Sequence, residues 1–236
     1  DARHIHGENG LANVSLPFSR HHQQHTAEKL ICDLARAHPG EVTLLCLGPL
    51  TNAARALQRD PQLADDLDQL VIMGGSIQAG GNITPAAEFN IYSDPHAAHI
   101  VFEAGLKLTM IGLDVTHQAR ATPERLEAIR AIGNPAAVCV AGMLDFYGEQ
   151  YIEMFGEGAP LHDPCVIAYI LRPHLFTGQE MRVDIEISSP LTIGRTVCDV
   201  HARSGKAENV NVLEKIDAPG FFRLLEERLA RLSKTG

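Results

Sequence analysis

The sequence has little that would cross-link the chain. Its 236 residues contain five cysteines, an odd number, and no two of them form a C-x-x-C pair. They are spread along the chain as Cys32, Cys46, Cys139, Cys165 and Cys198. A disulfide scaffold normally has an even set of cysteines at regular spacings, so this pattern favours a reducing cytoplasm.

Long apolar runs and clustered basic residues are also missing. The apolar stretches at 42–47 and 108–113 are too short to span a bilayer, and the first residues show no basic-then-apolar signal pattern. A formal net charge of -9 argues against nonspecific binding to nucleic acid, which needs Lys and Arg to neutralise phosphates. We therefore expect a soluble, cytoplasmic protein with no membrane or nucleic-acid partner. Its ligand would be a small neutral or cationic molecule, or a metal.

No single motif assigns a reaction. The chain has no zinc-ligand spacing, phosphate loop or nucleophile elbow, and Gly74-Gly75 with Gly80-Gly81 does not make the dinucleotide fingerprint. Internal repeats and low-complexity tracts are missing too. Function must therefore be sought in the order of helices and strands and in the loops between them.

The sequence does contain a regular alternation of helical and strand-like segments. Apolar positions at helical spacing predict helices at 26–38, 52–57 and 95–104. Short apolar runs predict strands at 42–47, 70–73 and 108–113. Near-continuous apolar strands between helices indicate one α/β domain over residues 1–236. We expect an open, mostly parallel sheet with helices on both faces.

The second half of the chain changes character. Helices are predicted at 123–132, at 135–155, from Asp163-Pro164 onward and at 219–232, with short strands at 183–187, 192–200 and 209–213. In parallel sheets, ligands gather at the carboxyl ends of the strands. The site is therefore expected in the loops after strands, at 48–52, 74–90 and 114–117.

The loop that follows Met73 carries the most unusual polar residues. If Glu88 to Asn90 is extended, these two side chains point to the same face and present a carboxylate and an amide together. Such a pair can bind the vicinal hydroxyls of a sugar. From the spacing alone, the alternative is a solvated loop with ordinary polar residues.

His162-Asp163-Pro164 is the second candidate segment. Asp163 suits the cap of a helix whose first position is Pro164. It also suits a carboxylate ligand for a hard cation such as calcium. His162 would then be a general acid or a contact to a nucleobase, although a lone histidine is more often an ordinary polar residue.

Six short segments carry a resemblance to one family. They are His-Gly-Glu-Asn-Gly-Leu at 6–11, Gly-Pro-Leu-Thr-Asn at 48–52, Val-Ile-Met-Gly-Gly at 71–75, Ala-Glu-Phe-Asn-Ile at 87–91, Gly-Leu-Asp-Val-Thr at 112–116 and His-Asp-Pro at 162–164. In this order they resemble the inosine-uridine-preferring nucleoside hydrolases over almost the whole chain. The resemblance implies that family's α/β fold with a Rossmann-like core.

The resemblance also implies a reaction. Family members hydrolyse the N-glycosidic bond of purine or pyrimidine ribonucleosides to free base and ribose. A calcium ion holds the ribose hydroxyls and the attacking water, while the sugar gains oxocarbenium character. Family members are commonly dimers or tetramers, so the resemblance implies a homo-oligomer.

Residue roles follow from the matching positions. The resemblance implies that His162 protonates the leaving base, and that Asp163 and the main-chain carbonyl of Leu47 are calcium ligands. The substrate-binding set that it implies is His6, Met73, Asn82, Glu88, Phe89 and Asn90. Tyr147 and Tyr151 lie where the family has a mobile flap over the base, and they either stack on a nucleobase or pack along a helix face.

One family feature is not found in these residues. It is an aspartate-rich loop of the form Asp-Thr-Asp-Pro-Gly-x-Asp-Asp, which supplies calcium ligands and the presumed base. We therefore expect a family fold that lacks its N-terminal portion, an incomplete calcium site, and little or no turnover by these residues alone. The alternative function is a catalytically inactive, truncated homologue that acts as a nucleoside-binding or oligomerisation module.

Overall fold

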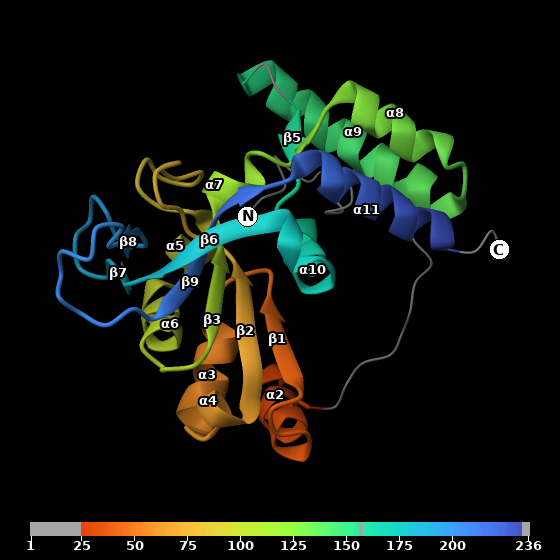
Figure 1. Cartoon of the computed structure of the whole chain (residues 1–236). Coiled ribbons are helices and arrows are strands. Elements are labelled where there is room, and N and C mark those ends of the chain that lie inside the picture. Colours follow the sequence, from red (N-terminus) through yellow and green to blue (C-terminus); the bar gives the residue numbers. More distant parts are fainter. Residues whose placement is uncertain (1–24, 156–157, 233–236) are drawn as a thin grey trace. The chain divides into compact units, whose positions relative to one another are not determined.

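The computed structural model describes residues 25–155 and 158–232, which fall into two compact units (Figure 1). We call residues 25–116 and 162–215 the sheet unit, and the described residues within 117–161 and 216–232 the helical unit. Each unit has its own cluster of buried apolar side chains. The expectation of one domain over residues 1–236 stays a prediction.

A five-stranded sheet forms the centre of the sheet unit. The spatial order is β1-β2-β3-β9-β6, and the pairs from β1 to β9 are parallel. The strands are β1 (Val42–Cys46), β2 (Leu67–Met73), β3 (Leu108–Ile111), β6 (Phe176–Met181) and β9 (Val210–Ile216). Parallel neighbours are joined by helical crossovers, so the expected α/β fold with a mostly parallel sheet is confirmed.

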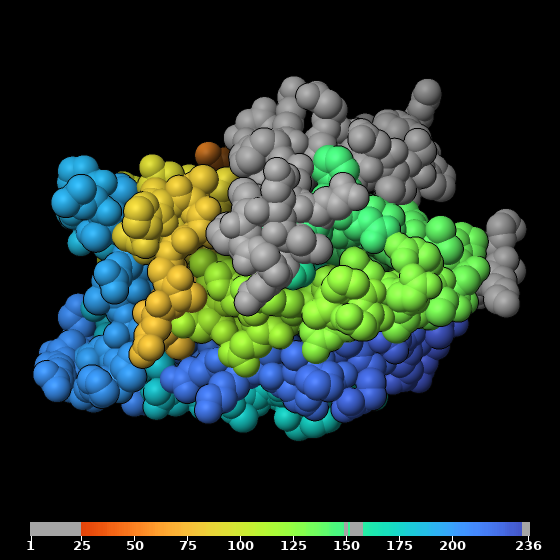
Figure 2. Space-filling model, turned by 90° about the horizontal axis from the view of Figure 1, so that it is seen from above, coloured from red at the N-terminus to blue at the C-terminus, as the bar shows by residue number. Residues whose placement is uncertain are grey.

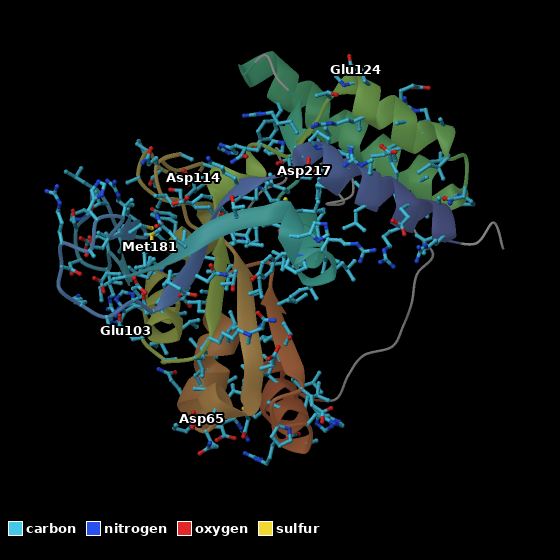
Figure 3. All side chains as sticks on the ribbon, in the orientation of Figure 1. Asp65, Glu103, Asp114, Glu124, Met181 and Asp217 are labelled. Atoms are coloured by element: carbon cyan, nitrogen blue, oxygen red, sulfur yellow. The ribbon has the colours of Figure 1, made fainter. Side chains whose placement is uncertain are left out.

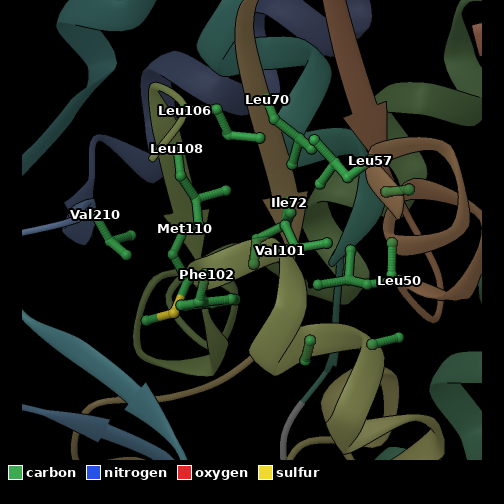
Figure 4. Packing of buried hydrophobic residues seen from close by; sticks show 14 of the residues in the cluster. Leu50, Leu57, Leu70, Ile72, Val101, Phe102, Leu106, Leu108, Met110 and Val210 are labelled. Atoms are coloured by element: carbon green, nitrogen blue, oxygen red, sulfur yellow. The ribbon is translucent and has the colours of Figure 1, made fainter. Parts of the chain in front are cut away.

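Helices cover both faces of this sheet. Leu70 and Ile72 of β2 face one side, where they pack with α2 (Ala27–Ala37), α3 (Thr51–Arg59) and α6 (Pro95–Phe102) in the main core (Figure 4). Intervening residues face the other side. There Asn211 of β9 donates to the hydroxyl of Tyr169, 3.3 Å away on α10 (Asp163–Leu171).

Helix starts in the sheet unit follow local sequence signals. Asp94 precedes α6, accepts a hydrogen bond from the N–H of Ala97 and is followed by Pro95 in the first turn. This is a favoured way to satisfy the free N–H groups of a first turn. Three further short helices, α4 (Leu63–Asp66), α5 (Phe89–Ser93) and α7 (Leu113–Thr116), were not predicted.

Three parts of the sheet unit differ from the prediction. Strand β3 ends at Ile111, two residues early, because the N–H of Leu113 turns to donate to the carbonyl of Gly75 at 2.9 Å. Strand β6 was missed, because its four middle residues are exposed and polar or glycine. After the turn η1 (Pro173–Leu175), the hairpin of β7 (Val183–Ile185) and β8 (Thr196–Cys198) is antiparallel and shorter than expected.

The helical unit packs three helices around a small core. They are α8 (Pro123–Ala131), α9 (Pro135–Phe155) and α11 (Ala218–Arg231), with a short antiparallel pair of β4 (Arg120–Ala121) and β5 (Ala159–Pro160). Their core contains Ile129, Ala137, Ala141 and Leu229. All three helices lie within two residues of the predicted bounds. Within the described residues, no helix is both long and apolar enough to cross a membrane.

Candidate functional site

Three segments meet beyond the carboxyl ends of β1 and β2. The side-chain amide of Asn90, near the start of α5, donates to the carbonyl of Met73 at 3.0 Å and lies 3.5 Å from the carbonyl of Leu47. Met73 is the last residue of β2, and Leu47 follows β1. The structure therefore brings together Leu47, Met73 and Asn90, in the loop region where ligands of parallel sheets gather.

Glu88 is the cap residue directly before α5; its own backbone is extended, whereas Phe89 and Asn90 are helical. Its carboxylate oxygen Oε2 accepts from the N–H groups of Asn90 at 3.0 Å, Ile91 at 3.4 Å and Gly75 at 3.1 Å. The prediction of an extended 88–90 segment is therefore wrong, because the carboxylate caps a helix. The carboxylate and the amide nevertheless lie close together, through the first turn of α5 instead of a strand pleat.

The environment of Glu88 disfavours its charge. The side chain is buried, with only 3% of the residue exposed, and this burial raises the pKa of Glu88 above its ordinary value. The three N–H bonds oppose this rise, and the negative charge of Asp163 adds to it. No cation forms an ion pair with Glu88 within 25–155 and 158–232, so its charge is held by backbone dipoles.

Asn82 and Phe89 are joined at the rim of this cluster. The side-chain oxygen of Asn82 accepts from the N–H of Phe89 at 2.8 Å, and the Phe89 ring is 40% exposed. The chain turns tightly before Asn82, since a Cβ on Gly81 would lie 2.1 Å from the carbonyl of Thr84. Asn82 is therefore held at the residue between Glu88 and Asn90, although it lies six or more positions before them in the sequence.

His162 and Asp163 stand at the start of α10. His162 occupies the cap position without a side-chain capping bond, and Asp163 is the first helical residue, one position later than the predicted cap. Nδ1 of His162 lies 2.8 Å from the hydroxyl of Thr116, which ends α7. The effect of Asp163 on the pKa of Glu88 places its charge within electrostatic range of that carboxylate.

The oxygen donors here match calcium in kind and fall short in number. The carboxylate of Asp163 and the carbonyl of Leu47 are hard-oxygen ligands, and a calcium ion takes six to eight of them. Among the described residues, no group of three or more His, Cys, Asp or Glu side chains could hold a metal ion. These residues do not by themselves make a calcium site.

The remaining predicted residues are His6, Tyr147 and Tyr151. His6 lies outside the described residues. Tyr147 and Tyr151 belong to α9 of the helical unit, where their rings form an edge-to-face pair with centroids 4.9 Å apart. This contact along one helix face agrees with the packing interpretation, and stacking on a nucleobase stays a prediction.

Four residues that matter to this geometry had no predicted role. Thr116 contacts His162, Gly75 donates to Glu88, and both Asp114 and Thr196 bind the backbone of the loop after β2. Asp114 and Thr116 do belong to the quoted Gly-Leu-Asp-Val-Thr segment, so the sequence contained a signal for them. Thr196 had none, because its contact spans 120 positions.

A buried carboxylate and amide at the strand ends of an α/β sheet are typical of enzymes that act on small molecules. The family model described as inosine-uridine preferring nucleoside hydrolase matches residues 1–223. The chain belongs to this family and is, by that membership, a nucleoside hydrolase.

Relatives of two kinds are similar to this chain. A pyrimidine-specific ribonucleoside hydrolase, RihA, from Shewanella oneidensis is 47% identical over 99% of this chain and 74% of its own length. RihA from an Enterobacter species is 46% identical over 98% of this chain and 75% of its own length. Among solved structures, a purine-preferring ribonucleoside hydrolase from Gardnerella vaginalis is 32% identical with a TM-score of 0.91, covering 100% of this chain and 75% of that one.

Proposed function

We propose that this protein hydrolyses the N-glycosidic bond of ribonucleosides and releases a free base and ribose. The observation that carries the proposal is the buried pair of Glu88 and Asn90 at the carboxyl ends of β1 and β2. A carboxylate and an amide at one point match the acceptors and donors of vicinal ribose hydroxyls. An uncharged, polar sugar also suits a pocket in a protein of net charge -9.

Glu88 and Asn82 would bind ribose, and Glu88 would also favour the positive charge that the sugar gains in the transition state. Within the described residues, the backbone bonds of Glu88 all go to Oε2, which leaves Oε1 to accept a ribose hydroxyl. A carboxylate that backbone dipoles hold in place stabilises an oxocarbenium-like sugar without reorganising first. The side-chain N–H groups of Asn82 remain to donate to a hydroxyl, because its oxygen already accepts from Phe89.

His162 would protonate the departing base. Its Nδ1 lies 2.8 Å from the hydroxyl of Thr116, and this contact fixes the orientation of the ring. Histidine is suited to general acid catalysis near neutral pH because its ordinary pKa lies there. Thr116 would thus set the direction of the proton transfer.

We also propose that the reaction depends on calcium and prefers pyrimidine nucleosides. Asp163 and the Leu47 carbonyl would supply two ligands, and the others would have to come from outside the described residues. Uridine and cytidine are favoured over inosine because the relatives at 46–47% identity are named pyrimidine-specific, whereas the purine-preferring structure is 32% identical. A dimer or tetramer in the cytoplasm is proposed with this function.

A second candidate is nucleoside binding without turnover. It is favoured by one observation, namely that the residues proposed to bind ribose come together, whereas only two of the proposed calcium ligands, Asp163 and the Leu47 carbonyl, lie in the described residues. The two candidates differ in whether ribose is released. They agree that uridine binds beside Glu88 and Asn90.

The decisive experiment measures ribose release from uridine and inosine with calcium and with a chelator. Hydrolysis predicts release that the chelator abolishes, and a fall of about 100-fold in His162→Gln. The matched control is His201→Gln, because His201 is an exposed histidine of the same unit in a loop away from the cluster. Saturable binding of uridine without release would favour the second candidate, and neither binding nor release would refute both.

A further inference from the structure

The loop between β2 and α5 is held by a side chain from the end of β3. Asp114, on α7, accepts from three consecutive N–H groups: Oδ2 from Ile77 at 2.6 Å, and Oδ1 from Gln78 at 2.9 Å and Ala79 at 3.0 Å. Figure 3 places Asp114 at the end of the sheet opposite to Asp65. Hydrogen bonds to a carboxylate are stronger than neutral ones, so this part of the loop is fixed.

A second side chain holds the same loop from the other direction. The hydroxyl of Thr196, on β8, accepts from the N–H of Ser76 at 2.9 Å and donates to its carbonyl at 2.6 Å. Thr196 is 4% exposed, so both bonds are shielded from water. Figure 2 shows this loop, in gold, beside the blue segment that contains the β7–β8 hairpin.

Both contacts hold the residues that directly follow Gly75, which is the donor to Glu88. Gly75 lies between Gly74, whose N–H donates to Ile111 at 3.1 Å, and the anchored Ser76. Its φ of +77° is left-handed, and a Cβ there would lie 2.7 Å from the methyl group of Thr196. In this conformation the N–H of Gly75 donates to Oε2 of Glu88 at 3.1 Å.

We propose that Asp114 and Thr196 are positioning residues for nucleoside binding. They form a two-point clamp that fixes residues 76–79, and through Gly75 they hold the Glu88 carboxylate in the orientation that accepts a ribose hydroxyl. Neither residue touches the substrate. The gain in affinity for the nucleoside comes from preorganisation, since a loop that is ordered before binding loses less conformational entropy when the ligand binds. The inference rests on the proposed role of Glu88 in binding ribose.

The test compares isosteric and conservative variants of the clamp. Thr196→Val keeps the shape and loses both hydroxyl bonds, whereas Thr196→Ser keeps the hydroxyl. Asp114→Asn removes one acceptor oxygen from three N–H groups. The control is Asp199→Asn, because Asp199 accepts from the N–H groups of Arg203 and Ser204 in another loop.

Two measurements are made on each purified variant: amide hydrogen exchange of residues 75–79, and the Kd and KM for uridine. We expect exchange at least about 10-fold faster in Thr196→Val and Asp114→Asn, since hydrogen bonds that hold the loop are lost. The Kd and KM are expected to rise by about 10-fold with a smaller change in kcat, because the loss acts on bound substrate and transition state alike. Thr196→Ser and Asp199→Asn should stay close to the wild type.

The outcomes separate this inference from the proposed function. Faster exchange with unchanged Kd and KM would mean that the clamp is only structural, and unchanged exchange would mean that it does not hold the loop. Either result overturns the positioning role while the wild type still binds uridine. Wild-type protein that neither binds nor cleaves uridine would instead refute the proposed function, and the positioning role with it.

Discussion

The sheet unit and the helical unit bury polar groups for different purposes. Of the seven buried polar residues in the described part of the chain, only Asn134 lies in the helical unit. The other six belong to the sheet unit: Ser76, Glu88, Asn90, Thr109, Thr116 and Thr196. Burying polar groups costs free energy unless they are hydrogen-bonded, so both distributions require an explanation.

Asn134 satisfies the ends of two helices. Its side-chain oxygen accepts from the N–H of Ala137 in the first turn of α9, and its amide donates to the carbonyls of Leu229 at 2.8 Å and Leu232 at 3.2 Å at the end of α11. Glu88 instead brings a carboxylate that no cation neutralises within the described residues. Helix ends explain the first case, whereas a buried charge held ready for a ligand explains the second.

The largest expected effect concerns this charge. We predict that Glu88→Gln lowers kcat/KM for uridine by at least about 100-fold, because it removes the negative charge beside the developing positive charge of the sugar. Ribose release at several uridine concentrations measures it. Glu186→Gln is the matched control, since Glu186 accepts from the N–H groups of Ser188 and Ser189 in an outer turn. Wild-type activity in Glu88→Gln would remove the functional distinction between the two units.

The next effect belongs to the helical unit and should concern stability alone. Asn134→Ala removes the side-chain partner of the Ala137 N–H and one donor from each of the carbonyls of Leu229 and Leu232, and we expect the free energy of unfolding to fall by about 2 kcal/mol. Urea unfolding measures the change, and the Kd for uridine should not move once the variant is folded. A weakened affinity for uridine would contradict the assignment of Asn134 to helix ends.

The main strands were predictable because of where they lie. Strands β2 and β3 are largely buried and β1 is half-buried along its whole length, so their sequences are nearly continuous apolar runs, and each overlaps its predicted range. Strand β6 lies at the end of the strand order with its middle residues exposed, and its sequence FTGQEM carries no apolar pattern. A strand without a buried stripe leaves little trace in the sequence.

The site was predictable in its residues and less so in its geometry. The carboxyl-end rule selected the loop at 74–90, which contains Glu88 and Asn90, and Asn90 does lie near Leu47, the last residue of the predicted strand at 42–47. The extended conformation expected for Phe89 and Asn90 was wrong, since glutamate is not among the favoured helix caps and the start of α5 was not predicted. The Thr196 contact was not predictable, because no periodicity links residues 120 positions apart.

A smaller effect is a pH dependence of opposite sign in the two units. Burial raises the pKa of Glu88. The folded state therefore binds the carboxyl proton more tightly than the unfolded chain, in which the pKa of Glu88 is near 4.5. Its contribution to stability is present below pH 4.5 and is lost as the pH rises through the folded pKa. The pKa of Glu124 is lowered by the Thr122 hydroxyl, so its contribution is present above pH 4.5 and is lost as the pH falls.

Urea unfolding from pH 3 upward checks both signs, as the difference between the wild type and each Gln variant. The N–H bonds lower the pKa of Glu88 and the charge of Asp163 raises it. The prediction is therefore the sign of the change in stability with pH, not its size. With Glu88→Gln, the stability of the wild type relative to the variant should fall as the pH rises. A slope of the same sign for Glu88 and Glu124 would mean that burial does not dominate at Glu88.

The smallest effect tests a cation–π contact of the helical unit. The guanidinium of Arg125 lies 4.2 Å from the centre of the Phe222 ring and also donates to the carbonyl of Arg120 at 2.6 Å. Arg125→Lys keeps the charge and loses the planar stack, so the free energy of unfolding should fall by about 0.5–1 kcal/mol. Urea unfolding of this variant and of Phe222→Leu, alone and combined, gives the coupling energy.

Because the contact joins α8 and α11 within one unit, kcat and KM for uridine should stay at their wild-type values. A change in either would show that helix packing in this unit reaches the reaction, and that burial of polar groups alone does not divide the molecule by function.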